Sequence, residues 1–382
     1  MTAVPRPLMP RAFRCRCGRP VFFRNSECLA CHTPLGYDPV RRQLLPLERI
    51  DSPATPANGS TLWRAVSRRK SRPYQRCAQL DTPAACNWLV DPADKHAVLQ
   101  PGQPPLCRCC RLTRTLPDLS LPENQRYWRL IAQAQRRLVS TLIGLDLPVK
   151  AKTSEDPQHG LAFDVLRSLP GQMPVVTGHA DGVITLDAEE ADDARREQRR
   201  TDLREPYRTL LGHLRHESGH YYWQHLVDVQ ASPWLDAFRE LFGDERQDYA
   251  AALQAHYQNG APADWRQRHV SAYASSHPWE DWAETWAHYL HLRDTLDTAR
   301  SFGVDGENVE LNYERFKPEV LGTWADAGAP AFLALVNGWM ELTGVLNELS
   351  RSMGMPDFYP FVLSASALRK LYLVHRVIGA PA

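Results

Sequence analysis

The strongest constraint in this sequence is the segment His216-Glu-Ser-Gly-His220, which lies within residues 207–229, a run with the pattern of a helix. Residues four apart share one face of a helix, so His216 and His220 can offer two imidazole nitrogens to one metal ion. Glu217 would project beside them and act as general base toward a zinc-activated water. Gly219 has no side chain, so another element can approach closely. The motif therefore predicts a helix built around a zinc site suited to hydrolysis.

The motif is short, and the same residues on an exposed, charged helix would form no metal site, so a third ligand is required. Residues 273–288 supply candidates, because Pro278 suits the first turn of a second helix. Glu280 and Glu284 would then lie one turn apart on one face. Catalytic zinc sites with two histidines commonly take a carboxylate as third ligand, and Glu280 is the expected one.

Glu284 is expected beside the ligand set, accepting a hydrogen bond from the second ring nitrogen of a ligating histidine. The two glutamates could exchange these roles, and the helix dipole also favours acidic residues at a helix start without any metal. Asp281 is expected to face away from the metal. His288 and His291 are weaker ligand candidates, since a surface or core histidine would look the same.

These two segments together resemble the gluzincin metallopeptidases, in which a glutamate on a second helix completes the H-E-x-x-H site. Glu284 stands where the thermolysin-type pattern has an aspartate. Residues 273–289 are also similar to the corresponding stretch of lethal-factor-type metallopeptidases, in which a tyrosine faces the zinc. The resemblance implies that Tyr273 donates a hydrogen bond to the oxyanion of the tetrahedral intermediate, although a buried structural tyrosine would fit the same pattern.

The N-terminal third contains two sets of cysteines that predict a separate, metal-bound module. The first set consists of two close pairs with ten residues between them, which suits four thiolates around tetrahedral zinc: Cys15, Cys17, Cys28 and Cys31. The second set is more widely spaced and consists of Cys77, Cys86, Cys107 and Cys110. Cys109 is left over, although it could replace Cys110 as a ligand. The second set could instead be reduced structural thiols. We therefore expect one catalytic zinc and one or two structural zinc ions.

Disulfides are the other interpretation of the nine cysteines. They are disfavoured because the sequence begins without an apolar signal segment, and a protein without one stays in a reducing compartment. With 43% hydrophobic and 23% charged residues and no apolar run near eighteen residues, no membrane span is expected. The expected location is cytoplasmic.

The chain's 382 residues suggest two or three domains, and its net charge of +1 conceals an asymmetry. Residues 1–120 hold nineteen Lys and Arg against eight Asp and Glu, whereas residues 121–382 hold twenty-six against thirty-six. We expect a basic head at 1–120 and an acidic body at 121–382. The head, including Arg68-Arg69-Lys70, could bind nucleic acid or an acidic protein, but a solvated basic face has the same composition.

The body has the periodicity of a mostly helical domain with a small sheet. A helix is expected from Pro122 to Ile143, and further helices over 234–241, 249–257 and around 332–342. Residues 175–187 predict two strands joined around Asp181-Gly182. By analogy with zinc peptidases, Val183–Asp187 is expected to be a sheet edge that binds extended substrate.

A resemblance extends over almost the whole chain and is carried by the ribbon together with three segments: Gly212-His-Leu-Arg-His216-Glu-Ser-Gly-His220-Tyr-Tyr-Trp223, His277-Pro-Trp-Glu280-Asp-Trp-Ala-Glu284 and Met353-Gly-Met-Pro-Asp-Phe-Tyr-Pro360. The chain resembles zinc-binding metallopeptidases with an N-terminal zinc ribbon. This likeness implies an α+β fold, with a zincin-like metallopeptidase domain after the ribbon, and zinc-dependent hydrolysis of peptide or protein substrates. The alternative is a binding protein whose ribbon recruits nucleic acid or a protein partner, with a structural or regulatory zinc body.

Overall fold

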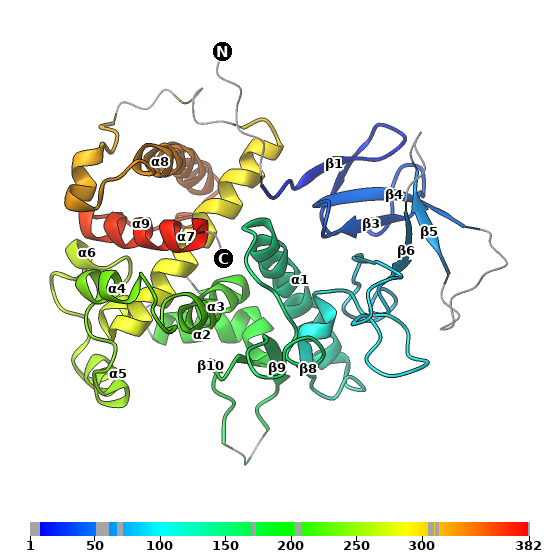
Figure 1. The fold of residues 1–382 in the computed structure, drawn as a ribbon, viewed down its shortest axis with the longest axis horizontal. Helices are drawn as coiled ribbons and strands as arrows, with labels where there is room; N and C mark the ends of the chain where they lie inside the picture. Colours follow the sequence, from blue (N-terminus) through cyan, green and yellow to red (C-terminus); the bar gives the residue numbers. More distant parts are fainter. Residues whose placement is uncertain are drawn as a thin grey trace. The chain divides into compact units, whose positions relative to one another are not determined.

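The structure is a computed structural model, and about 44% of it is helical and 14% lies in strands, which confirms the α+β class (Figure 1). The chain divides into two compact units, Met1–Asp202 with Thr209–Leu211 and Leu203–Arg208 with Gly212–Ala382. The basic triplet Arg68-Arg69-Lys70 lies outside the described residues. The structure describes residues 8–50, 61–66, 72–169, 171, 173–202, 208–304, 309 and 313–380.

The N-terminal part of the first unit is built from short antiparallel strands. β1 (Ala12–Arg14) and β2 (Pro20–Phe22) form a two-stranded sheet. A second sheet has five strands in sequence order: β3 (Leu35–Asp38), β4 (Gln43–Arg49), β5 (Trp63–Ala65), β6 (Pro73–Arg76) and β7 (Leu89–Val90). Leu47, Tyr74 and Leu89 form a small buried cluster on this sheet, against which Leu45 and Trp63 pack.

A third, four-stranded sheet has the order β10-β11-β9-β8. The hairpin of β10 and β11 turns at Asp181 and Gly182, whose φ angles are 47° and 72°, as a tight turn between twisted strands requires. This confirms the predicted pair of strands. β11 also pairs in parallel with β9, so it lies inside the sheet, and the prediction that it is a free edge is wrong. The strands span Thr113–Thr115 (β8), Ala162–Leu166 (β9), Gly178–Ala180 (β10) and Val183–Asp187 (β11).

The compact units do not divide at residue 120. β8 precedes that residue and pairs in parallel with β9, which follows it after one helix. α1 (Pro122–Gly144), which matches the helix expected from Pro122, belongs to the first unit together with the ribbon. Because strand pairing crosses residue 120, the division into 1–120 and 121–382 stays a prediction about modules, while the structural division lies near Asp202.

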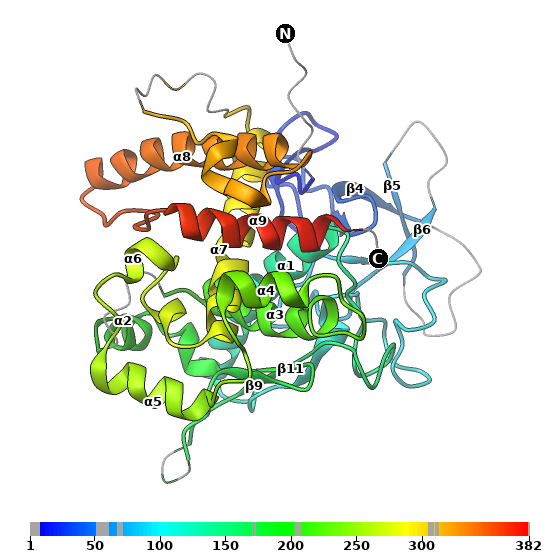
Figure 2. The same cartoon turned by 60° about the vertical axis from the view of Figure 1, so that its left-hand side comes forward.

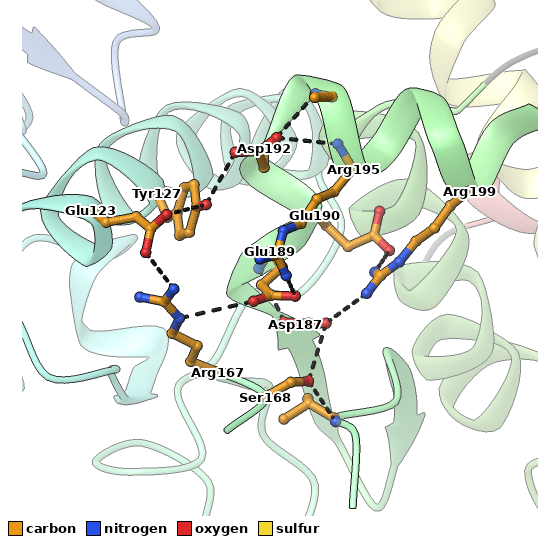
Figure 3. A network of polar contacts seen from close by, with 12 residues as sticks. Glu123, Tyr127, Arg167, Ser168, Asp187, Glu189, Glu190, Asp192, Arg195 and Arg199 are labelled. Carbon is orange, nitrogen blue, oxygen red and sulfur yellow. Dashed lines mark hydrogen bonds and ion pairs between the residues drawn. The ribbon is translucent and has the colours of Figure 1, made fainter. Parts of the chain in front are cut away.

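A network of charged side chains attaches α2 (Asp193–Asp202) to the end of β11 (Figure 3). Asp187 and Glu190 are each 1% exposed, and both accept hydrogen bonds from Arg199 of α2. Glu189, in the short η2 (Ala188–Ala191), forms an ion pair with Arg195. Buried carboxylates are costly unless they are paired, so these arginines stabilise the turn from strand to helix. The network continues through Glu123, Tyr127, Arg167, Ser168 and Asp192.

The second unit is helical, and α7 lies at its centre (Figure 2). η3, α4, α8 and α9 all pack on α7. Pro278 occupies the first turn of α7 as expected, and the side chain of His277 caps this helix by accepting a hydrogen bond from the Trp279 amide. The elements are α3 (Leu210–Leu226), α4 (Leu235–Phe242), α5 (Tyr249–Asn259), α6 (Trp265–Arg268), η3 (Tyr273–Ser275), α7 (Pro278–Ser301), η5 (Pro318–Trp324), α8 (Ala329–Ser352) and α9 (Ala365–Gly379).

α3 crosses α7 at Gly219, where the two backbones come very close. A Cβ atom at Gly219 would lie 2.9 Å from the Cα atom of Ala283. Two buried tryptophans of α7 reach across the crossing: the indole N–H of Trp282 donates to the Gly219 carbonyl at 3.0 Å, and that of Trp286 donates to the Ser218 hydroxyl at 3.1 Å. Both indole groups are therefore buried with their hydrogen bonds satisfied.

Among the described residues, α8 alone is long and apolar enough to cross a membrane by length and composition. No such segment is expected from the sequence, which contains no apolar run near eighteen residues. Half of the apolar window is buried inside the structure, and the core helix of a soluble protein passes the same test. Phe332, Val336 and Trp339 make up part of this buried face.

Gly219→Ala should lower the free energy of unfolding by about 1–3 kcal/mol, because the added methyl group must push the α3 and α7 backbones apart. Gly338→Ala in α8 is the matched control, since its Cβ atom would meet only Leu296 at 3.9 Å. There alanine should be neutral or stabilise the helix by up to about 1 kcal/mol. Denaturant unfolding of both variants tests this, and equal effects would contradict the close crossing.

Candidate metal sites and active site

His216 and His220 of α3 converge with Glu280 of α7 on one point. The Nε2 atom of His216 lies 2.9 Å from Oε2 of Glu280, and that of His220 lies 3.4 Å from Oε1 of the same carboxylate. One donor atom from each residue lies within 4.8 Å of the others. Ligand atoms on a tetrahedral zinc ion with bonds of about 2.05 Å are about 3.3 Å apart, so the observed nitrogen to oxygen separations fit zinc.

Glu284 lies one turn beyond Glu280 and outside this donor cluster. Its Oε1 atom is 2.7 Å from Nδ1 of His216, and its Oε2 atom accepts a hydrogen bond of 2.6 Å from the hydroxyl of Ser271. A proton on Nδ1 directed at Glu284 leaves the Nε2 lone pair of His216 free for a cation. The structure therefore places Glu280 among the metal donors and Glu284 behind one of them. Ser271 was not found by sequence analysis, because no motif marks it.

Tyr249, the first residue of α5, also contacts the donor cluster and was not found from the sequence. Its hydroxyl donates a hydrogen bond of 2.6 Å to Oε1 of Glu280. Glu280 is 1% exposed, so this bond stabilises a buried carboxylate and restricts its orientation. The predicted helix over 249–257 is confirmed, but a helical pattern does not say which element that helix faces.

The histidines and glutamates of this cluster shift one another's pKa values. Burial lowers the pKa of His216, but hydrogen bonds with Glu280 and Glu284 outweigh burial and raise this pKa well above its usual value. For Glu280, burial raises the pKa, but the charge of His220 and the contact with His216 bring it well below the usual range. A positive charge between the two helices is thus stabilised by buried carboxylates, which is what a cation site requires.

Glu217 lies beside the donors and is 8% exposed. No residue in the described part of the chain donates a hydrogen bond to its carboxylate, in contrast to Glu280 and Glu284. Burial raises the pKa of Glu217. A carboxylate with a raised pKa is a stronger base, and its oxygens are not already engaged, so Glu217 is suited to accept and return a proton.

Tyr273, in η3, lies beside one of the donor histidines. Its ring centroid is 5.9 Å from that of His216, and no described residue makes a hydrogen bond with its hydroxyl. Burial, followed by the negative charge of Glu280, raises the pKa of Tyr273 well above its usual value. The phenol therefore keeps its proton and can donate a hydrogen bond to an oxyanion.

The remaining candidates from the sequence are engaged elsewhere. Asp281 faces away from the donors, as expected, and pairs with Lys370 at 2.5 Å. His288 contacts the hydroxyl of Tyr359, and His291 contacts the guanidinium of Arg215. Burial lowers the pKa of His288 to about 4, so it is neutral. Neither histidine belongs to the donor cluster.

The first cysteine set forms a compact cluster in the ribbon. The Sγ atoms of Cys15 and Cys31 are 3.5 Å apart, and those of Cys17 and Cys28 are 3.8 Å apart. Thiolates on tetrahedral zinc, with bonds of about 2.3 Å, are about 3.8 Å apart, so the cluster fits zinc. Hydrogen bonds from Thr33 lower the pKa of Cys31 to about 6, which prepares one thiolate.

The second cysteine set also converges, in the interior of the first unit. Cys77, Cys86, Cys107 and Cys110 are all buried, with one Sγ atom from each within 4.8 Å of the others. The Sγ atoms of Cys86 and Cys107 are 3.7 Å apart. Cys109 is buried outside the cluster. All nine cysteines lie in the described residues and none forms a disulfide, since these separations far exceed the disulfide length of about 2.05 Å.

Comparisons with known proteins agree with this arrangement. The family model described as "Putative zinc-binding metallo-peptidase" matches residues 124–377, and a zinc-ribbon domain model matches residues 12–121. Uncharacterized proteins of Mycobacterium tuberculosis and Mycobacterium bovis are 41% identical to this chain over 369 residues, covering 96% of this chain and 95% of theirs. No solved structure matches the chain significantly.

The metallo-peptidase model covers the α3 and α7 segments with all three donor residues, and the ribbon model covers both cysteine clusters. The chain therefore belongs to the zinc-binding metallo-peptidase family and carries a zinc-ribbon domain at its N-terminal end.

Proposed function

We propose that this protein is a gluzincin-type peptidase, in which His216, His220 and Glu280 hold one catalytic zinc ion. The observation that carries the proposal is the convergence of these three donors beside Glu217, a carboxylate that no described residue engages. The two cysteine clusters would hold structural zinc. Peptide or protein substrates follow from the family together with this chemistry.

When bound, zinc supplies a Lewis acid that polarises the scissile carbonyl and makes water acidic. Glu217 takes the proton of the attacking water and later passes it to the leaving amine, so one carboxylate serves as base and then as acid. Tyr273 donates a hydrogen bond to the oxygen that becomes negative during the attack. Glu284 and Ser271 act indirectly, because they hold the ring of His216 in the orientation that directs Nε2 toward Glu280.

Glu217→Gln should leave the fold and the zinc content unchanged and lower peptide hydrolysis by about 10²–10⁴-fold, because an amide cannot take up the proton. Cleavage of a mixture of fluorescence-quenched peptides measures this. Glu240→Gln, at an exposed position of neighbouring α4, is the control and should be fully active. Equal activity of both variants would contradict the proposed general base.

Elemental analysis should find three zinc ions per chain, one for each donor cluster. The double variant His216→Ala/His220→Ala should lose one of the three, because a lone carboxylate does not hold zinc tightly, and should keep the two in the cysteine clusters. Circular dichroism of the variant checks that it is folded. Unchanged zinc content in a folded variant would overturn the metallopeptidase proposal.

A second function, recruitment of nucleic acid by the head, is favoured by four arginines in the β1–β2 hairpin and directly after it. All four are exposed, and no carboxylate of the described residues lies within ion-pair distance of any of them: Arg14, Arg16, Arg19 and Arg24. Phe22 of the same hairpin is 46% exposed. Unpaired arginines beside an exposed aromatic ring suit a single-stranded nucleic acid, through phosphate contacts and base stacking. The head would then bring the peptidase unit to its substrate.

Replacing all four arginines by glutamine should weaken binding of an oligothymidylate and reduce its salt dependence, by about 0.7 in logarithmic slope for each lost phosphate contact. Fluorescence anisotropy at several salt concentrations tests this. Arg64→Gln is the control, since this exposed arginine is already paired with Glu48. If the wild-type protein binds an acidic peptide but no oligothymidylate, the partner of the head is a protein.

A further inference from the structure

A pocket of about 300 Å³ opens beside the donor cluster in the second unit. Its walls come from four parts of the fold: α3, the segment after α4, the start of α5 and the start of α7. The residues that line it are Trp223, Glu245, Tyr249, His277 and Trp279. Four of the five are aromatic side chains, so the pocket presents ring faces to whatever occupies it.

Two of the lining residues also touch the metal donors. The hydroxyl of Tyr249 donates to Oε1 of Glu280 at 2.6 Å, and the ring centroid of Trp279 lies 4.0 Å from that of His220. Only the side chains of Tyr249 and Trp279 would thus separate a side chain in the pocket from the metal donors. Because the pocket adjoins the metal donors, its expected occupant is a substrate side chain.

The ionisable groups of the pocket already have partners, whereas no described residue accepts a hydrogen bond from the buried indole N–H groups of Trp223 and Trp279. Glu245 accepts hydrogen bonds from Nε of Arg239 at 3.0 and 3.2 Å, and this contact lowers the pKa of Glu245 below its usual range. His277 accepts at Nδ1 from the Trp279 amide and faces the Gln247 carbonyl with Nε2 at 3.2 Å, which corresponds to the neutral imidazole. The pocket therefore offers no uncompensated charge to a substrate.

The volume and the walls together define the class of side chain. An apolar cavity of about 150 Å³ accommodates benzene, so a pocket of about 300 Å³ has room for a phenyl, phenol or indole group. Aromatic walls gain stacking and edge-to-face contacts with such rings. A lysine or arginine would have to compete with Arg239 for the Glu245 carboxylate.

We propose that this pocket is a side-chain subsite of the peptidase, and that it selects substrates with a bulky apolar, preferably aromatic, residue next to the cleaved bond. The inference rests on the proposed peptidase function, but binding to the pocket is separate from turnover. Tyr249 has two roles in it: its ring forms one wall, and its hydroxyl holds Glu280.

Binding is measured on the full-length Glu217→Gln protein, which cannot turn substrate over if the proposal is right. Titration with the N-acetyl amides of phenylalanine, tryptophan, alanine and arginine, followed by tryptophan fluorescence and ligand-observed NMR, should show that the two aromatic amides bind about 10- to 100-fold more tightly than the other two. Equal affinity for alanine, or a preference for arginine, would overturn the proposal.

Three further variants in that background locate the binding. Tyr249→Ala should remove most of the preference for aromatic amides, while Tyr249→Phe, which keeps the ring and loses only the hydroxyl, should retain it. Tyr257→Ala is the matched control, because Tyr257 is an exposed tyrosine on the same helix that does not line the pocket. Loss of preference in Tyr257→Ala as large as that in Tyr249→Ala would overturn the assignment.

Arg239→Gln tests the charge argument. Without the guanidinium, the Glu245 carboxylate is left unpaired at the pocket, and affinity for the arginine amide should rise by about tenfold while that for phenylalanine stays the same. No gain for arginine would contradict the role given to the ion pair. If the protein prefers aromatic amides but the wild type cleaves no peptide, the proposed subsite stands and the proposed peptidase function is refuted. If the wild type cleaves peptides without preferring aromatic amides, the peptidase function stands and the subsite is refuted.

Discussion

The close crossing of α3 and α7 at Gly219 is the contact on which the candidate active site depends. Two histidines are supplied by one helix and one glutamate by the other, so the donor atoms meet only if the helix axes approach to within backbone contact. Trp282 and Trp286 hold this approach from the α7 side, through hydrogen bonds to α3 that satisfy their buried indole groups. The close packing of the two backbones and the hydrogen bonds of the buried indole groups thus occur at the same place, and the metal donors lie beside it.

The same crossing concentrates charge in a buried place, which would destabilise the fold if the charges were not matched. Glu280 and Glu284 approach His216 from two sides, and Tyr249 and Ser271 donate to the remaining carboxylate oxygens. Glu217 is the exception, because no described residue donates to it. Glu280 and Glu284 each accept a hydrogen bond from a neighbouring hydroxyl, whereas Glu217 stays available, so proton transfer is concentrated in a single side chain.

The first unit contains the ribbon strands and both cysteine clusters. Its ribbon strands are two to seven residues long, and Leu47, Tyr74 and Leu89 form a small apolar cluster among them. Metal binding by the two thiol clusters would supply folding energy directly. The β8–β9 pairing and the Arg199 network then attach the next helices to the ribbon, which is why the compact unit extends to Asp202 rather than ending at residue 120.

Sequence periodicity alone determined the local parts of this protein: a helix that places His216 and His220 on one face, a second helix beginning at Pro278, and a hairpin turning at Asp181-Gly182. These features depend on a few neighbouring residues, as does the spacing of the paired cysteines. Tertiary structure decided which glutamate joins the histidines, brought Tyr249 and Ser271 to them, and placed β11 between two partners. Each of these depends on contacts between residues far apart in the chain, whose register and crossing angle no local pattern encodes.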